Sequence, residues 1–485
     1  MKIRFHSVSI AVLAMILTGC STSPPVAMKA SEMPGAFTAP MTPGAPETIS
    51  TEWWKSFSNP EMTDLVTTAQ ANNLDLAQAS ARVLQAQAQT GVATSALFPS
   101  IDLNGSGRRQ GTKTPGTTYN TFGASLGASY ELDFWGQAQD NMRAARNSAR
   151  AAIYARDVVS LTTTADVANT YFAVLALRER ITIAKKNIEA AQRILAITQA
   201  KLDNGAVSNL EVAQQQALLS GEEAQIPALE EQEREERYAL AILLGRVPEG
   251  FDVKGNNIDD VVAPPVGPGM PSALLQRRPD IAAAEANLLA AHANLDAARA
   301  AFLPAIGLTG SGGYASGAIS SLINPSSLAW SVGASLLQTI FDGGRLTSQR
   351  DVAQGREAEL VAAYRSTVLN ALSDVESGLG SVSSLTERQR LTDEEARNAA
   401  EAFRISELQY REGVADPLAV LQAQQTMFSS QDTLVQIKLP RLQAGVGLYR
   451  ALGGGWTVDA DKDIPTRNTF VPVPDLTDLP IGKPF

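Results

Sequence analysis

Apolar residues alternate strictly with small or polar residues along two stretches of the chain, at residues 121–132 and 330–336. A repeat of two residues is typical of a β-strand with two different faces. The apolar faces consist of Phe122, Ala124, Leu126, Ala128, Tyr130 and Leu132 in the first stretch, and of Trp330, Val332, Ala334 and Leu336 in the second. Residues 101–108 and 306–314 can supply partner strands. The pattern therefore predicts two β-hairpins, at about residues 100–132 and 305–341.

Two long stretches without proline, residues 138–204 and 346–415, have the pattern of helices. At about 1.5 Å per residue, each would be roughly 100 Å long if unbroken. Each ends at a glycine-containing turn, which suits a helix C-terminus. The returning helices are expected to begin at Ser208 and at Asp416-Pro417, because serine and aspartate cap helix N-termini and proline fits the first turn. The sequence therefore predicts two long helical hairpins, with tips at about 205–209 and 413–417.

The chain repeats itself once. Gly205 and Gly413 lie 208 residues apart, and the same offset joins Leu244-Gly245 to Leu452-Gly453. This spacing indicates one tandem duplication of a unit of roughly 200 residues, rather than a solenoid of short repeats. The expected divisions are a signal peptide at 1–19, a flexible tether at 20–50, a first repeat at 51–261, a linker at 262–271, a second repeat at 272–456 and a proline-rich tail at 457–485.

The apolar hairpin faces have two explanations. In a soluble sandwich they would meet a core, whereas in an outer-membrane barrel they would meet lipid while the polar faces line water. A soluble coiled-coil stalk would explain the long helices but not the hairpins. Beyond the N-terminal signal the chain has no run of 18 apolar residues, so we expect a barrel. Four strands cannot close one, since small barrels need about eight, and three copies would pool about twelve. The residues expected to face lipid include Phe122, Leu126, Trp330 and Val332.

The N-terminus resembles a bacterial lipoprotein signal. Lys2 and Arg4 precede a short apolar run, and Leu17-Thr18-Gly19-Cys20 fits cleavage before Cys20 and acylation of its thiol and new amine. Ser21 follows, rather than an aspartate that would favour the inner membrane. The alternative is an unmodified thiol behind an ordinary secretory signal. We therefore expect N-acyl and diacylglycerol groups on Cys20, and no other cofactor.

Composition and charge argue against several classes of protein. The formal net charge of −10 gives no support to nucleic-acid binding, which favours a basic surface. The mature chain has one histidine, His292, and its single cysteine is expected to carry lipid, so a Cys/His zinc site is not expected. A Ser/His/Asp triad would depend on His292, which lies in an alanine-rich helix and is interpreted as a packing residue. We expect neither an enzyme nor a metal site.

Five short motifs resemble those of one known family. They are Trp53-Trp54-x-x-Phe57-x-Asn59-Pro60, Leu275-x-Arg277-Arg278-Pro279-Asp280-Ile281, Phe302-Leu303-Pro304, Phe341-Asp342-Gly343-Gly344-Arg345 and Ala451-Leu452-Gly453-Gly454-Gly455-Trp456. Together, over about residues 50–456, they resemble the TolC-like outer-membrane efflux lipoproteins, the outer-membrane factors of drug-efflux pumps. The resemblance implies an α+β fold in which a homotrimer forms a 12-stranded outer-membrane β-barrel, a 12-helix periplasmic α-barrel and an equatorial domain.

The resemblance also implies a function and partners. The chain would be the passive exit channel of a tripartite efflux pump and would conduct small molecules, such as drugs or toxic compounds. Its partners would be a periplasmic adaptor protein, an inner-membrane proton-driven transporter and outer-membrane lipid. Two alternatives stay open, namely a duct for protein export and a non-conducting structural lipoprotein of the envelope.

A gate at the periplasmic tip, in residues 410–425, is a further implication of the resemblance. Tyr410 matches a tyrosine of the family, and Leu418 matches its constricting apolar residue. Glu211 resembles an acidic residue that pairs across protomers, here with Tyr410 or Arg411, although a solvated helix residue is an equal alternative. The family's aperture charges fall at positions that are uncharged here, which leaves Asp416 as the nearby carboxylate. These uncharged positions are Ala419, Gln422 and Gln425.

Overall fold

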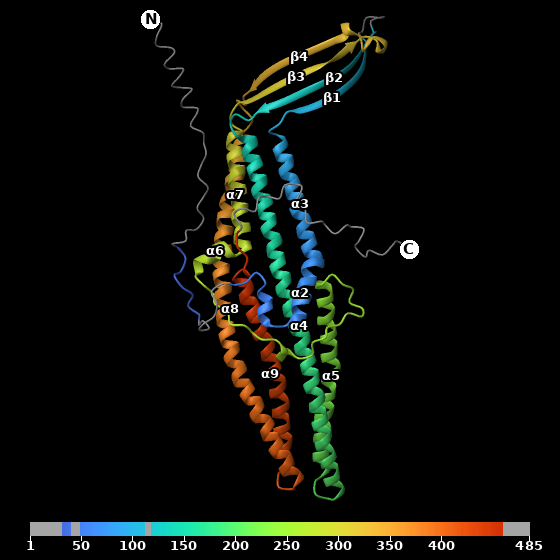
Figure 1. Cartoon of the computed structure of the whole chain (residues 1–485), viewed down its shortest axis with the longest axis vertical. Helices are drawn as coiled ribbons and strands as arrows, with labels where there is room; N and C mark the ends of the chain where they lie inside the picture. Colours follow the sequence, from blue (N-terminus) through green and yellow to red (C-terminus); the bar gives the residue numbers. More distant parts are fainter. Residues whose placement is uncertain (1–31, 40–48, 112–117, 459–485) are drawn as a thin grey trace.

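The computed structural model describes residues 32–39, 49–111 and 118–458, and it shows an elongated chain with a sheet at one end and two helical hairpin tips at the other (Figure 1). The expected α+β class is confirmed. The strands are β1 (Ser100–Gly111), β2 (Thr118–Leu132), β3 (Ala305–Ser316) and β4 (Leu328–Leu337). The α-helices are α2 (Pro60–Asn72), α3 (Leu74–Ser95), α4 (Gln137–Asp203), α5 (Asn209–Leu243), α6 (Leu274–Arg277), α7 (Pro279–Ala300), α8 (Arg345–Arg411) and α9 (Pro417–Ala451). Short 3-10 helices are η2 (Trp53–Phe57), η3 (Ile258–Asp260), η4 (Pro271–Ala273), η5 (Ile319–Ser321) and η6 (Pro325–Ser327).

The four strands form one antiparallel sheet in the order β1-β2-β3-β4. The two predicted hairpins are joined because β2 pairs with β3. Strand β4 ends at Leu337, short of the predicted 341, since the chain then turns through Gly343 and Gly344, which have positive φ, into α8. Strands β1 and β4 are the edges, and each has a pairing partner on one side only within the described chain.

Helices α4 and α8 are each 67 residues long. That length corresponds to roughly 100 Å, as the absence of proline predicted. Ser208 caps α5 and Asp416 caps α9, each by accepting a hydrogen bond from a backbone amide of the first turn. Helix α8 ends at Arg411, and Gly413, with a φ of 79°, closes the turn, as the glycine-containing turn predicted.

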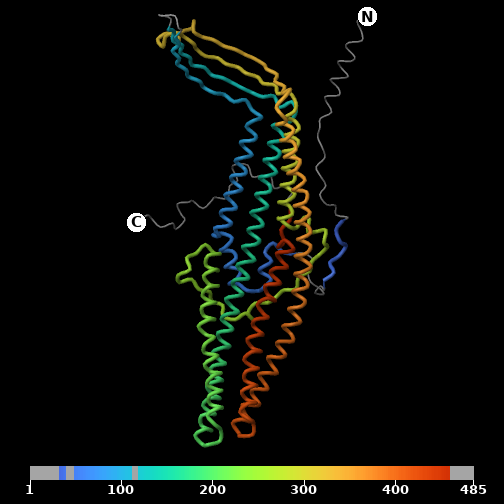
Figure 2. Tube along the Cα trace, turned by 180° about the vertical axis from the view of Figure 1, so that it is seen from behind, coloured from blue at the N-terminus to red at the C-terminus, as the bar shows by residue number. Residues whose placement is uncertain are grey.

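The helices form a curved layer in which α4 and α8 run through both halves of the molecule. Next to the sheet, α4 packs between α3 and α7, and α7 packs on α8. Towards the tips, α4 packs between α5 and α9, and α9 packs on α8. Figure 2 shows from behind that both tips lie at the same end, away from the sheet. The two repeats therefore contribute equivalent helices at each level.

Residues 60–95 form two helices rather than one. Asn73 separates α2 from α3 with an extended backbone, and its side chain accepts a hydrogen bond from Leu76 N at 3.0 Å. The same side chain donates to Leu243 O at 2.9 Å, which ties the break to the end of α5. Asn73 is therefore a helix cap that the apolar pattern alone did not separate from a helix interior.

The main core lies at the middle of the molecule, where the motif that begins at Trp53 is buried. Trp53 stacks on Tyr449 of α9 with ring centroids 5.2 Å apart, and Phe57 packs against Phe172 of α4. The core also takes up Phe37 from the described N-terminal segment 32–39. Within the described residues, no helix combines the length and apolar character needed to span a bilayer.

Candidate functional site

The two hairpin tips lie side by side at the end of the molecule opposite the sheet (Figure 1). On the second tip, Leu418 is the second residue of α9 and is 51% exposed. Its backbone amide donates to the Asp416 carboxylate at 2.8 Å, so Asp416 is occupied as a helix cap. Leu418 therefore presents an apolar side chain to solvent at the start of a capped helix. This position suits contact with the Leu418 side chains of other copies of the chain. Its role as a constriction stays a prediction.

Tyr410 ties the two hairpins together within one chain. Its ring is buried, and its hydroxyl lies 3.1 Å from the hydroxyl of Thr198 on α4. Because the Thr198 hydroxyl donates to Ile194 O at 2.8 Å, Tyr410 must be the donor in this pair. The ammonium group of Lys201 lies 4.7 Å from the centre of the Tyr410 ring, a cation–π contact. The tyrosine implied by the resemblance thus fastens α8 to α4.

Glu211 has a local role that the sequence contained but that we did not recognise. Its carboxylate accepts hydrogen bonds from the backbone amide of Ser208, at 2.9 Å, and from the Ser208 hydroxyl. The bond from the Ser208 amide, together with the one that the Ser208 side chain accepts from the backbone amide at the third helical position, forms a capping box at the start of α5. Both bonds from Ser208 favour the ionised Glu211 and so lower its pKa. Pairing across protomers stays a prediction, and since the Tyr410 hydrogen is used by Thr198, the exposed Arg411 is its better partner.

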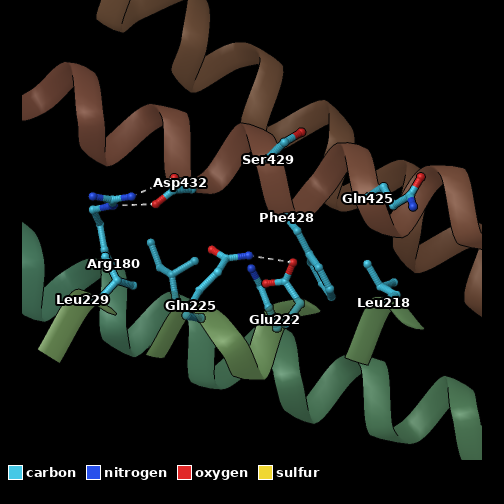
Figure 3. Close-up of a pocket in the computed structure, with 12 residues that line it drawn as sticks. Arg180, Leu218, Glu222, Gln225, Leu229, Gln425, Phe428, Ser429 and Asp432 are labelled. Atoms are coloured by element: carbon cyan, nitrogen blue, oxygen red, sulfur yellow. Dashed lines mark hydrogen bonds and ion pairs between the residues drawn. The ribbon is translucent and has the colours of Figure 1, made fainter. Parts of the chain in front are cut away.

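Between the two helical hairpins, α5, α4 and α9 line a cavity of about 260 Å³ (Figure 3). Gln425 lines it, and Gln422 is exposed on the same helix. Across the cavity, Arg180 of α4 donates from Nε to Asp432 Oδ1 of α9 at 2.6 Å, and a second nitrogen donates to Oδ2 at 3.2 Å. Hence a bidentate ion pair joins the first helical hairpin to the second.

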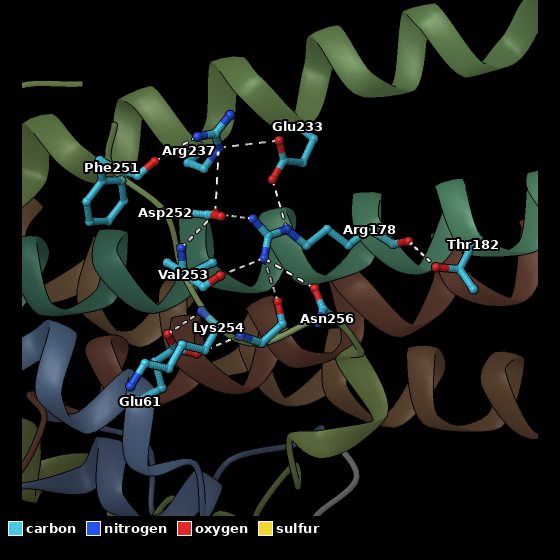
Figure 4. A network of polar contacts seen from close by, with 11 residues as sticks. Glu61, Arg178, Thr182, Glu233, Arg237, Phe251, Asp252, Val253, Lys254 and Asn256 are labelled. Carbon is cyan, nitrogen blue, oxygen red and sulfur yellow. Dashed lines mark hydrogen bonds and ion pairs between the residues drawn. The ribbon is translucent and has the colours of Figure 1, made fainter. Parts of the chain in front are cut away.

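A second polar network fastens the segment after α5 to the helices (Figure 4). Arg178 of α4 contacts the Glu233 carboxylate at 2.9 Å and donates to Val253 O at 2.7 Å. Glu61 of α2 accepts from the amides of Lys254 and Gly255, at 2.6 and 2.9 Å. A Cβ at position 255 would lie 2.6 Å from the hydroxyl oxygen of Tyr171, so a larger residue here would have to displace that side chain. The network ties the segment after α5 to α2 and α4.

The four residues predicted to face lipid lie on one face of the sheet. Leu126 of β2 and Trp330 of β4 both pair with Gly312 of β3, and Phe122 and Val332 lie an even number of positions from them. Trp330 and Val332 are 78% and 81% exposed. The opposite face carries hydroxyl pairs, such as Ser311 and Ser331 at 2.9 Å. The sheet thus has one apolar and one polar face, and their contact with lipid and water stays a prediction.

Cys20 and His292 are the two other residues that the sequence analysis considered as sites. Cys20 lies outside the described residues. His292 is buried, but it is more than a packing residue, because its Nδ1 lies 2.7 Å from a carboxylate oxygen of Glu357 on α8. In the part of the chain that the structure describes, no group of three or more histidine, cysteine or acidic side chains could hold a metal ion.

The contacts that join the hairpins were not predicted. The long helices carry these contacts at Thr198, Arg180 and Asp432. The apolar and polar positions along these helices do not show which side of each helix faces its neighbour. The sequence feature that comes nearest to predicting such a contact is a charged residue within a stripe of apolar helix positions. The same feature is usual at a solvent-exposed helix edge, so it does not identify a contact.

Comparison with known proteins places the chain in a family. The family model described as outer membrane efflux protein matches residues 65–246 and 270–454. The chain is 40% identical over 420 residues to the pyoverdine export outer membrane protein OpmQ of Pseudomonas aeruginosa, covering 84% of this chain and 88% of that protein. It is 30% identical to the cation efflux system protein CusC of Escherichia coli O6:H1, covering 92% of this chain and 97% of that protein.

Solved structures agree with the sequence relatives. The outer-membrane channel OprN superposes with a TM-score of 0.83 at 26% identity, covering 90% of this chain and 99% of that one. The open state of the MtrE outer membrane channel of Neisseria gonorrhoeae superposes with a TM-score of 0.82 at 29% identity, covering 90% of this chain and 98% of that one. The chain therefore belongs to the outer membrane efflux protein family, as its motifs predicted, and is an outer-membrane component of an efflux pump.

Proposed function

We propose that three copies of the chain form a passive exit channel that runs from the periplasm to the cell exterior. The sheet supports this number. It has four strands and two unpaired edges, so that β4 of one copy can pair with β1 of the next, and three copies supply twelve strands. Four helices cross each level of the long part of the molecule, so three copies also supply a ring of twelve helices. A closed ring leaves no exposed strand edge.

The proposal includes two protein partners and a lipid. A channel without an energy source needs an inner-membrane transporter to drive cargo, and a periplasmic adaptor to join the two. The lipid on Cys20 would hold the N-terminus at the outer membrane, and one acylated cysteine anchors a chain without spanning the bilayer. We propose no cofactor beyond this lipid and no catalytic step.

We infer that the cargo is a small molecule. The support is that two relatives, at 40% and 36% identity, are named for pyoverdine export, and others are named for antibiotic, toluene or cation efflux. None of these five names refers to protein export. The transporter would choose the cargo, because the chain itself is proposed to be a passive duct.

Deletion of the gene in its own host tests this function. Cells that lack the chain should retain the exported compound, or should become more sensitive to toxic compounds, and a plasmid copy should restore export. If secreted proteins are retained instead while small molecules leave normally, the duct serves protein export. If neither changes and the envelope spacing does, the chain is a structural lipoprotein.

A further inference from the structure

The cavity between the hairpins holds a carboxylate that no step of the proposed channel uses. Glu222 of α5 is 9% exposed and lines the cavity together with Leu218, on the side facing α9 (Figure 3). Its Oε1 accepts a hydrogen bond from Gln225 at 3.2 Å. Among the described residues, no cationic group forms an ion pair with it. A buried carboxylate without a cation is costly when ionised, which makes Glu222 sensitive to proton concentration.

Charged and amide groups from α9, α4 and α5 surround Glu222. From α9, the Asp432 carboxylate faces the cavity and is held by the bidentate pair with Arg180 of α4. From α4, the Asn187 amide also reaches Glu222. Burial raises the pKa of Glu222 above the ordinary 4.5, and the charge of Asp432 adds to the rise, while the amides of Gln225 and Asn187 oppose it. Arg180, Glu222 and Asp432 are the charged residues that line the cavity.

The cavity exists only while the two hairpins are packed, because α4 and α5 form one wall and α9 forms the other. If α9 moved away from α5, water would enter and Glu222 would lose the environment that disfavours its charge. We propose that Glu222 is a proton-operated latch between the helical hairpins, so that its protonated form stabilises the packed tips and its ionised form favours their separation. This inference rests on the proposed channel function, which makes separation of the tips an opening step.

The sign of the effect follows from linkage. The packed state holds the proton more tightly than the separated state, in which the pKa of Glu222 would return towards 4.5. The packed tips therefore gain stability from Glu222 at acidic pH, fully below 4.5. They lose this contribution as the pH rises through the raised pKa. Acid should close the tips, and neutral pH should favour separation.

The direct test uses full-length protein in planar lipid bilayers between pH 4.5 and 7.5. The unaltered protein should show a lower open probability at the acidic end. In Glu222→Gln, which copies the neutral form without a change of shape, that dependence should disappear and the open probability should stay low at every pH. The matched control is Glu223→Gln, on the next residue of α5, which is exposed and should keep the pH dependence of the unaltered protein.

A distance measurement separates the latch from the channel function. Spin labels on Leu218→Cys and Gln425→Cys, which lie on opposite walls of the cavity (Figure 3), report its width without any conduction. The distance should be longer at pH 7.5 than at pH 4.5, and Glu222→Gln should keep the short distance throughout. If the distance does not respond to pH, or if Glu222→Gln responds as the unaltered protein does, the latch is refuted. A pH-dependent distance that Glu222→Gln abolishes, in a protein that does not conduct, would leave the latch and refute the channel.

Discussion

The hydroxyl groups of Tyr410 on α8 and Thr198 on α4 lie 3.1 Å apart, and both side chains are buried near the end of the molecule away from the sheet. The two residues are 212 positions apart in the chain, one in each repeat. This hydrogen bond therefore joins the two halves of the duplication near the hairpin tips.

Removal of this bond should loosen the tips. Tyr410→Phe keeps the ring and its contact with Lys201 but deletes the donor, and one such bond contributes about 0.5–1.5 kcal/mol. The ratio of open to closed tips should rise roughly two- to tenfold per chain, measured as resting conductance. Tyr238→Phe is the control, because Tyr238 lies on α5 with its side chain partly exposed. Equal conductance of Tyr410→Phe and the unaltered protein would show that the tips are held elsewhere.

The packing around Gly255 should make a side chain at that position destabilising. In Gly255→Ala, the new methyl group would lie 2.6 Å from the Tyr171 hydroxyl oxygen and 2.7 Å from Leu175 Cδ2. Overpacking of this kind costs about 1–3 kcal/mol, which should lower the thermal unfolding midpoint of the purified protein. Gly221→Ala is the matched control, since nothing lies within 4 Å of its site on α5, and it should be neutral or slightly stabilising. Equal midpoints for the two variants would refute this account of the segment after α5.

The two faces of the sheet should differ in their tolerance of charge. Val332→Arg places a cation on the apolar face and should destabilise the inserted barrel by about 2–4 kcal/mol if it lies near the middle of the bilayer. Ser331→Arg, one residue away on the polar face, should cost far less. Denaturant titration of the protein in bilayers measures both. The reverse order would mean that the polar face meets lipid.

Cys20 should carry the lipid. Cys20→Ser should leave an uncleaved or soluble precursor, because lipoprotein processing depends on the modified thiol. Mass spectrometry of the mature N-terminus gives the answer in the unaltered protein. A mature peptide that begins downstream of Cys20 and has no added acyl mass would remove the anchor from the account.

The strands and long helices could be predicted from the sequence, because they depend on a regular spacing of apolar residues or on the absence of proline. Alternation places Leu126 and Trp330 on one face in any regular strand, so the shared face followed without knowledge of the pairing. The lengths of α4 and α8 followed from the absence of proline, and the tips from Gly205 and Gly413. Asn73 was missed as a helix break because a polar residue on a helix surface has the same appearance.

The contacts between the hairpins could not be predicted, for a physical reason. A helix of 67 residues turns continuously, and small departures from 3.6 residues per turn decide which side chains face a neighbour far along it. The pairs Arg180–Asp432 and Tyr410–Thr198 depend on that rotation. The burial of Glu222 could not be predicted for the same reason, since the adjacent Glu223 has the same side chain but is exposed.

The central claim, that the chain is a channel with its gate at the tips, is tested most directly by single-channel recording of the purified full-length protein in planar bilayers. Leu418 would form an apolar constriction that disfavours water and ions, so Leu418→Ser should raise the resting conductance, and Glu211→Ala should do so by loosening the start of α5. The account predicts discrete conductance steps, larger or more frequent in both variants than in the unaltered protein. An absence of steps in all three proteins would contradict a channel, and equal steps in all three would contradict a gate at Leu418.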